Sequence, residues 1–152
     1  MINLRTATSE QMLKIVPFLK VFSRLNQRIY RWSGGRLLGK LNGYEVCVVT
    51  MTGAKTGQTR VVPLMYVPYG DGVILVGSQG GTPKSPPWVH NLVANPDIEV
   101  QHKSRKMRLK ARRASAREKQ GVWPVCCQHY PDYELYQQRT ERDIPVFICE
   151  PR

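Results

Sequence analysis

Short strand-forming segments separated by glycine turns place the tightest constraint on the fold of this chain. Residues 44–52 and 60–67 are rich in valine, and a turn containing glycine and lysine, residues 53–59, lies between them. Residues 73–77 have the same character and follow Tyr69-Gly70-Asp71-Gly72, a strong hairpin signal. This pattern predicts three sequential antiparallel strands.

The second half of the chain adds helices and further short strands. Residues 85–94 predict a helix with two prolines in its first turn, and Ser115 is suited to cap a helix that reaches about residue 128. The remaining predicted elements are strands over 98–101, 106–114 and 144–149 and a helix over 132–139. Many short antiparallel strands with a few helices predict an α+β fold, a small closed or half-closed barrel with flanking helices.

An amphipathic helix is predicted before the barrel, beginning near Pro17. Its apolar face carries Phe18, Phe22, Leu25, Ile29 and Trp32, and its basic stripe carries Lys20, Arg24, Arg28 and Arg31. The apolar face suits either a membrane surface or the open end of the barrel, and both alternatives stay open. We therefore divide the chain into an N-terminal amphipathic segment, residues 1–40, and one barrel domain, residues 41–152.

The charge of the chain is strongly positive and unevenly placed. Lys and Arg outnumber Asp and Glu by 23 to 11, and the formal net charge is +12. The surplus lies in residues 1–40 and 101–119, which favours anionic ligands or anionic membrane surfaces. Neither basic patch is interleaved with exposed aromatic residues as in nucleic-acid stacking platforms, so we expect no nucleic-acid partner.

Cysteine spacing and hydropathy bear on compartment and metal binding. The four cysteines show no C-x-x-C spacing, so we expect no metal site and idle thiols in a reducing compartment. No run of 18 apolar residues and no secretory signal is visible. These features predict a cytoplasmic protein, with peripheral contact to the inner face of the cell membrane through the N-terminal helix as an alternative.

Residues 53–91 combine features that favour an anionic ligand with a flat ring. Lys55 and Arg60 flank one glycine turn, and the Gly77-Ser78-Gln79-Gly80-Gly81 run is expected close by. A guanidinium and an ammonium group can hold a phosphate or carboxylate chain, and Trp88 can pack against a ring. The alternative is an ordinary hairpin turn with solvated cations.

Several of these segments together resemble the deazaflavin-dependent nitroreductase family of split-β-barrel oxidoreductases. The resemblance rests on Thr52-Gly53-x-Lys55-x-Gly57-x-x-Arg60, Pro63-Leu64, Ser78-x-Gly80-Gly81, Pro87-Trp88-x-x-Asn91-Leu92-x-Ala94-Asn95-Pro96, Tyr130-Pro131-x-Tyr133-x-x-Tyr136 and Arg142-x-Ile144-Pro145-Val146. It implies a split barrel that binds coenzyme F420, an uncharged flat hydride carrier with a phosphate and glutamate tail. An FMN-dependent split-barrel reductase and a non-enzymatic F420 carrier are the alternatives.

The resemblance also implies the positions of the site residues. Contacts to the phosphate and tail are Ala54, Lys55, Thr56 and Arg60, and the ring is flanked on one side by Val61, Val62, Pro63, Leu64 and Met65. The other edge of the ring is flanked by Val76, Gly77, Ser78 and Gln79, and the pocket is closed by Pro87, Trp88, Val89, His90 and Asn91. Relatives often have lysine where Gln79 stands, and Lys84 is then expected to compensate.

The implied reaction is hydride transfer from the reduced cofactor to a conjugated lipophilic acceptor such as a quinone, with nitroaromatics as side substrates. By the same resemblance Ser78 lies near the reacting ring and Tyr130, Tyr133 and Tyr136 border the substrate, Tyr133 also touching the cofactor. The spacing of the tyrosines by itself is equally typical of a helix packed into a core. Neither His90 nor His129 is assigned proton transfer, and monomer and homodimer both stay open.

Overall fold

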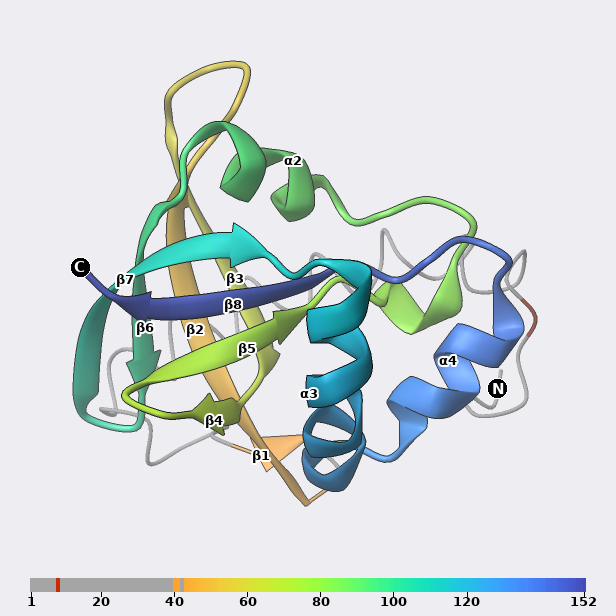
Figure 1. The fold of residues 1–152 in the computed structure, drawn as a ribbon. Coiled ribbons are helices and arrows are strands. Elements are labelled where there is room, and N and C mark those ends of the chain that lie inside the picture. Colours follow the sequence, from red (N-terminus) through yellow and green to blue (C-terminus); the bar gives the residue numbers. More distant parts are fainter. Residues whose placement is uncertain (1–7, 9–39, 42) are drawn as a thin grey trace.

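The computed structural model describes residue 8, residues 40–41 and residues 43–152. In these residues an antiparallel sheet of eight strands is flanked by three α-helices and one short 3-10 helix (Figure 1). The strands are β1 (Lys40–Leu41), β2 (Tyr44–Thr52), β3 (Thr59–Met65), β4 (Val67–Tyr69), β5 (Gly72–Val76), β6 (Asp97–His102), β7 (Arg105–Arg113) and β8 (Val146–Pro151). The helices are η1 (Gln79–Gly81), α2 (Pro87–Ala94), α3 (Ala116–His129) and α4 (Asp132–Arg139).

The sheet curls because its two end strands are neighbours in the chain. The order is β1-β2-β6-β7-β8-β5-β4, and β3 pairs with β2 on the edge opposite to β6. Apart from the two-residue strand β1, the end strands of the sheet are therefore β3 and β4. β3 and β4 therefore lie at opposite ends of the ladder, yet Tyr66 alone joins them. The ladder between β4 and β5 ends at the Val67–Ile74 pair, and no ladder in the described residues connects β3 to β5. The barrel is thus closed by the chain itself and split beside β3, as the resemblance implied.

Tyr66 is fixed at the point where the chain leaves β3. Its N–H donates to the carbonyl oxygen of Glu45 at 2.9 Å, and its ring stacks on His102 at 3.5 Å between centroids with an interplanar angle of 7°. The single strand expected over residues 60–67 is therefore wrong: β3 ends at Met65, and Val67 begins a separate strand. By contrast, the strand over 44–52 and the helix over 132–139 are confirmed.

Two apolar clusters hold these elements together. The first fills the barrel and includes Val49, Leu75, Trp88, Leu109 and Phe147. The second lies between the sheet and helices α3 and α4 and includes Ile74, Cys126, Tyr133 and Ile144. At the start of α3, Ser115 and Glu118 form a capping box, as the sequence pattern predicted in part. The α+β split-barrel assignment is confirmed by this arrangement.

The four cysteines are free thiols in the structure, and three of them are buried. Cys47, Cys126 and Cys149 are buried, Cys127 is half-buried, and all are free. Burial raises the pKa of Cys47 and of Cys126 to about 12, so both thiols stay protonated at neutral pH and are poor nucleophiles.

Other predictions concern the N-terminal segment. The predicted amphipathic helix and the boundary at residue 40 fall almost entirely outside the described residues, so the helix and the division of the chain stay predictions. Among the described helices, none has the length and apolar character needed to span a bilayer.

Candidate functional site

The β2–β3 hairpin ends in a tight turn that presents two cations. Its backbone is closed by hydrogen bonds from Gly53 N to Gln58 O at 2.8 Å and from Gly57 N to Gly53 O at 3.0 Å. Lys55 and Arg60 are both exposed, and neither forms an ion pair with any described residue. Cations with no acidic partner are available to bind an anion.

Helix α2 holds this turn in place, and in Figure 1 it lies beside the tip of the hairpin. Ala54 N donates to Asn91 Oδ1 at 2.9 Å, and Asn95 Nδ2 donates to Thr52 O at 3.4 Å. Asn91 also directs its amide group to Met51 Sδ at 3.8 Å. Asn91 therefore has a structural role, since it ties helix α2 to the hairpin. The sequence motif predicted a contact with the cofactor and did not reveal this role.

The faces of α2 separate anchoring residues from accessible ones. Trp88 and Val89 are buried, and the Trp88 ring lies 5.9 Å from the Phe147 ring inside the barrel. Pro87 and His90 are exposed. Trp88 thus fixes the helix to the core, while the accessible part of the predicted pocket wall is formed by Pro87 and His90.

Strand β3 offers an apolar surface beside the two cations. Its five residues predicted to flank the ring are all half-buried, namely Val61, Val62, Pro63, Leu64 and Met65. Val62 and Leu64 pack against the barrel core from one side. Only β2 pairs with β3 in the described part of the chain, and Pro63, which lacks an N–H, is compatible with such an edge strand.

The loop after β5 approaches from the other side of the split. Val76, Gly77 and Ser78 are buried, and Gly77 N donates to Pro145 O at 2.9 Å. Gln79 is half-buried, and its side-chain amide donates to Thr82 Oγ1 at 3.1 Å. Its polar group is thus already used within the loop.

The cation of this loop is Lys84. Its side chain is exposed and makes no ion pair with the described residues, while its carbonyl oxygen accepts a hydrogen bond from Thr82 Oγ1 at 3.0 Å. Lys84 therefore remains available for an anion, in keeping with the compensation expected for Gln79.

Two arginines hold this loop, and sequence reasoning assigned them no role. Arg142 donates to the carbonyl oxygens of Ser78 and Thr82, both at 2.8 Å, and Arg139 donates to that of Gly80 at 2.8 Å. The only signal available from the sequence was the Arg142-x-Ile144-Pro145-Val146 segment, which entered the resemblance without a function.

The three tyrosines of the predicted substrate side lie together in the second core cluster. Tyr130, Tyr133 and Tyr136 are 7%, 3% and 7% exposed, and the hydroxyl groups of Tyr130 and Tyr136 are 3.0 Å apart. The Tyr130 and Tyr133 rings meet edge to face at 5.0 Å. Burial raises the pKa of Tyr133 well above its ordinary value, so its hydroxyl stays protonated. Their contact with substrate stays a prediction.

The arrangement fits a phosphorylated ring compound and offers no evident metal site. The described residues contain no group of three His, Cys, Asp or Glu side chains able to hold a metal ion. They do contain cations without acidic partners at the hairpin tip and at Lys84, and the half-buried apolar strand β3 continues from that tip. Such a surface can bind an anionic tail and a flat ring at once.

The sequence is similar to that of a known enzyme family. The model of the F420H(2)-dependent quinone reductase family matches residues 22–151. An F420H(2)-dependent quinone reductase of Mycobacterium tuberculosis is 35% identical over 133 residues, which cover 85% of this chain and 89% of that protein.

Solved structures show the same relationship. A structure described as F420-H2 dependent reductase FDR-A is 41% identical, with a TM-score of 0.64 over 69% of this chain and 93% of that one. Another, described as a domain-swapped dimer, is 36% identical, with a TM-score of 0.66 over 88% and 99% of the two chains. The haem storage protein HutZ of Vibrio cholerae, 13% identical with a TM-score of 0.50, shares the fold alone.

Proposed function

Because the chain belongs to the F420H(2)-dependent quinone reductase family, we propose that it transfers hydride from reduced F420 to a quinone-like, conjugated lipophilic acceptor. One observation carries the proposal for the site: Lys55 and Arg60 lack acidic partners among the described residues and lie at the hairpin end from which the half-buried apolar part of β3 continues. The family match favours F420 over the FMN alternative. Nitroaromatic reduction is a side activity of the same hydride transfer.

The protein's part in this chemistry is binding and orientation. When bound, reduced F420 supplies a hydride, and a quinone that accepts it needs one further proton to become the hydroquinone. Arg60 can hold a phosphate or carboxylate with two parallel hydrogen bonds, whereas Lys55 and Lys84 act as point charges. Ala54 and Thr56 lie in the same turn and would contact the tail.

We place the ring of the cofactor at the split in the barrel, between β3 and the loop after β5. Val61 to Met65 would form its apolar support, and Val76, Gly77, Ser78 and Gln79 would lie at the opposite edge. A ring held there would be kept at reacting distance from the acceptor, and the apolar side chains of β3 would exclude water from one of its faces.

Acceptor binding is assigned to the tyrosines next to this loop. Tyr130, Tyr133 and Tyr136 would offer ring surface, which suits a lipophilic quinone, and hydroxyl groups able to donate hydrogen bonds to quinone oxygens. Burial raises the pKa of Tyr130 and of Tyr133, so both remain hydrogen-bond donors across the physiological pH range.

Titration of the purified protein with F420 and with FMN, followed by a turnover assay with water-soluble menaquinone analogues, tests the function. We expect F420 to quench tryptophan fluorescence at lower concentration than FMN and the quinone to be reduced only with reduced F420. Binding of F420 without turnover would instead identify a cofactor carrier. Tighter binding of FMN would contradict the proposal.

The assignment of Tyr133 is tested by removing its hydroxyl group alone. We expect Tyr133→Phe to lower kcat for the quinone by roughly tenfold, as expected for loss of a positioned donor, and to leave the dissociation constant of F420 within about twofold. Tyr69→Phe, at an exposed tyrosine of β4, is the matched control and should change neither. Equal losses of turnover and cofactor affinity would point to a structural role of Tyr133.

The proposal extends to the oligomeric state of the protein and to its contact with the membrane. We favour a homodimer, because a relative with 36% identity forms a domain-swapped dimer. Peripheral membrane contact through the N-terminal helix is retained because a lipophilic acceptor would be most concentrated there.

A further inference from the structure

Arg142 lies between α4 and β8, and its side chain ties this segment to the loop that follows β5. Its guanidinium group donates through Nε to Thr82 O at 2.8 Å and through Nη2 to Ser78 O at 2.8 Å and Gly77 O at 3.2 Å. Nη1 lies 3.4 Å from Ser85 Oγ. A planar fork with several fixed donors can bridge these separate carbonyl groups, whereas an ammonium group at one point cannot.

The loop needs this support because its own backbone is irregular. Gln79, Gly80 and Gly81 all adopt positive φ angles of 43°, 67° and 76°. A residue with a side chain, such as Gln79, occupies that region only where its surroundings hold it there. Arg139 adds a second restraint through Gly80 O at 2.8 Å and lies over the Tyr136 ring at 5.3 Å.

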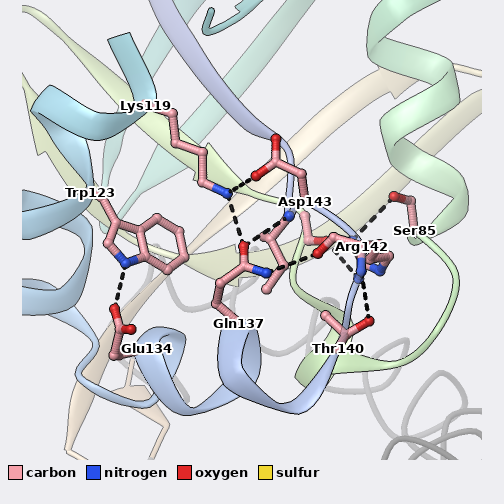
Figure 2. Close-up of polar contacts among 10 residues, drawn as sticks. Ser85, Lys119, Trp123, Glu134, Gln137, Thr140, Arg142 and Asp143 are labelled. Carbon is pink, nitrogen blue, oxygen red and sulfur yellow. Dashed lines mark hydrogen bonds and ion pairs between the residues drawn. The ribbon is translucent and has the colours of Figure 1, made fainter. Parts of the chain in front are cut away.

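A polar network from helices α3 and α4 fixes the backbone that carries Arg142, as Figure 2 shows. Gln137 Nε2 donates to Arg142 O at 2.8 Å, and Gln137 Oε1 accepts from Ile144 N at 3.0 Å. The same Oε1 accepts from Lys119 Nζ at 2.9 Å, and Lys119 also pairs with Asp143 at 2.5 Å. The amide of Gln137 thus uses both its donor and its acceptor.

From these contacts we propose that Arg142 is a positioning residue, which fixes Ser78 and Gln79 against the ring of the bound cofactor. The inference rests on the proposed function, because it assigns these two residues to the ring edge. Arg142 itself touches neither cofactor nor acceptor. Arg142 acts by binding the carbonyl groups of the loop. The hydrogen bonds of Gln137 hold the main chain of Arg142 at the position from which its side chain reaches them.

Arg142→Lys tests the proposal, since it keeps the charge and removes the fork. Arg112→Lys is the control for the same substitution elsewhere: Arg112 also uses both ends of its guanidinium fork, 2.6 Å to Glu118 and 3.3 Å to Glu150, but in surface ion pairs away from the loop. We expect Arg142→Lys to lower kcat by about tenfold, a typical result of small misplacements at a reacting centre, with little change in the KM for the quinone. Arg112→Lys should stay within about twofold of the parent in both constants.

A second readout needs no cofactor. Amide hydrogen exchange over residues 79–85 in the cofactor-free protein should become about tenfold faster in Arg142→Lys and stay unchanged in Arg112→Lys. Methylguanidinium at millimolar concentration should restore part of the turnover of Arg142→Ala, whereas urea at the same concentration should not. A residue needed only for global stability would show neither the confined exchange nor the rescue.

Each outcome decides the inference. Equal kcat in Arg142→Lys and Arg112→Lys, or faster exchange without loss of turnover, would overturn it. If Arg142→Lys does not fold, Gln137→Glu decides, because it keeps an acceptor for Lys119 and Ile144 N and replaces the donor to Arg142 O by a carboxylate oxygen that repels it. That variant should lower kcat by about threefold, and unchanged turnover would overturn the inference. If the parent protein neither binds F420 nor reduces a quinone, the proposed function fails, and the exchange result still reports whether Arg142 holds the loop.

Discussion

Replacement of Arg60 by alanine is expected to weaken F420 binding by about 1.5–3 kcal/mol, the range for hydrogen bonds to charged groups. This corresponds to a dissociation constant raised roughly 10- to 150-fold. The reason is that Arg60 is exposed, has no acidic partner among the described residues, and extends from the same turn as Lys55. Its removal deletes a bidentate anion contact without disturbing an internal ion pair. Quenching of tryptophan fluorescence during F420 titration measures the change.

A change of net charge alone must be separated from loss of a specific contact. Arg105→Ala removes the same charge at an exposed position at the start of β7 and should alter the dissociation constant by less than about twofold at physiological salt. Arg60→Lys should lie between the two, because it keeps the charge and loses the fork. The same affinity in Arg60→Ala and the parent protein would remove Arg60 from the cofactor site.

Gly81→Ala is expected to destabilise the fold by about 2–4 kcal/mol, from a left-handed backbone and an overpacked contact together. Gly81 has a φ of 76°, and a Cβ atom there would lie 2.5 Å from the carbonyl oxygen of Tyr136 and 3.1 Å from its Cα. Either the loop or helix α4 must move to admit the methyl group. Urea denaturation followed by far-UV circular dichroism measures the loss.

Two other glycines separate the contributions to this effect. Gly70 has a φ of 56°, and a Cβ atom added there would have no neighbouring atom within 4 Å, so Gly70→Ala should show the backbone effect alone, about 1–2 kcal/mol. Gly121, in the middle of α3, also has open space, and Gly121→Ala should stabilise the protein by about 0.5–1 kcal/mol. If Gly81→Ala were no worse than Gly70→Ala, the close approach of the loop to α4 would be disproved.

Local sequence signals predicted most elements because those elements have local causes. The strand over 44–52 follows from its run of valines and other strand formers, and α3 follows from Ser115 with Glu118 three residues later. The end of β3 has no such cause. It depends on Tyr66, whose ring stacks on His102 from a hairpin far along the chain, a contact that residues 60–67 alone do not encode.

The candidate site likewise contains residues that local sequence predicts and residues whose roles depend on contacts between distant parts of the chain. Lys55 and Arg60 could be assigned from the glycine turn, since both ends of one hairpin must lie close together. The burial of Trp88 against Phe147 and the hold of Arg142 on Ser78 O link residues more than 50 positions apart in the sequence, and no spacing rule joins them. The family resemblance supplied the residues of the loop, but it gave no role to Arg142, which it contained, and did not include Arg139.

The central place of β8 has a consequence for how the protein is made. Residues 146–151 form the strand between β5 and β7, with register from Val73 opposite Cys149 to Arg113 opposite Phe147. Until residues 146–151 have been synthesised, the nascent chain holds two separate parts of the sheet, one ending at β7 and one at β5. The backbone N–H and C=O groups along those two edges have no partner strand. Premature termination at residue 145 would therefore leave an aggregation-prone product rather than a slightly shortened enzyme.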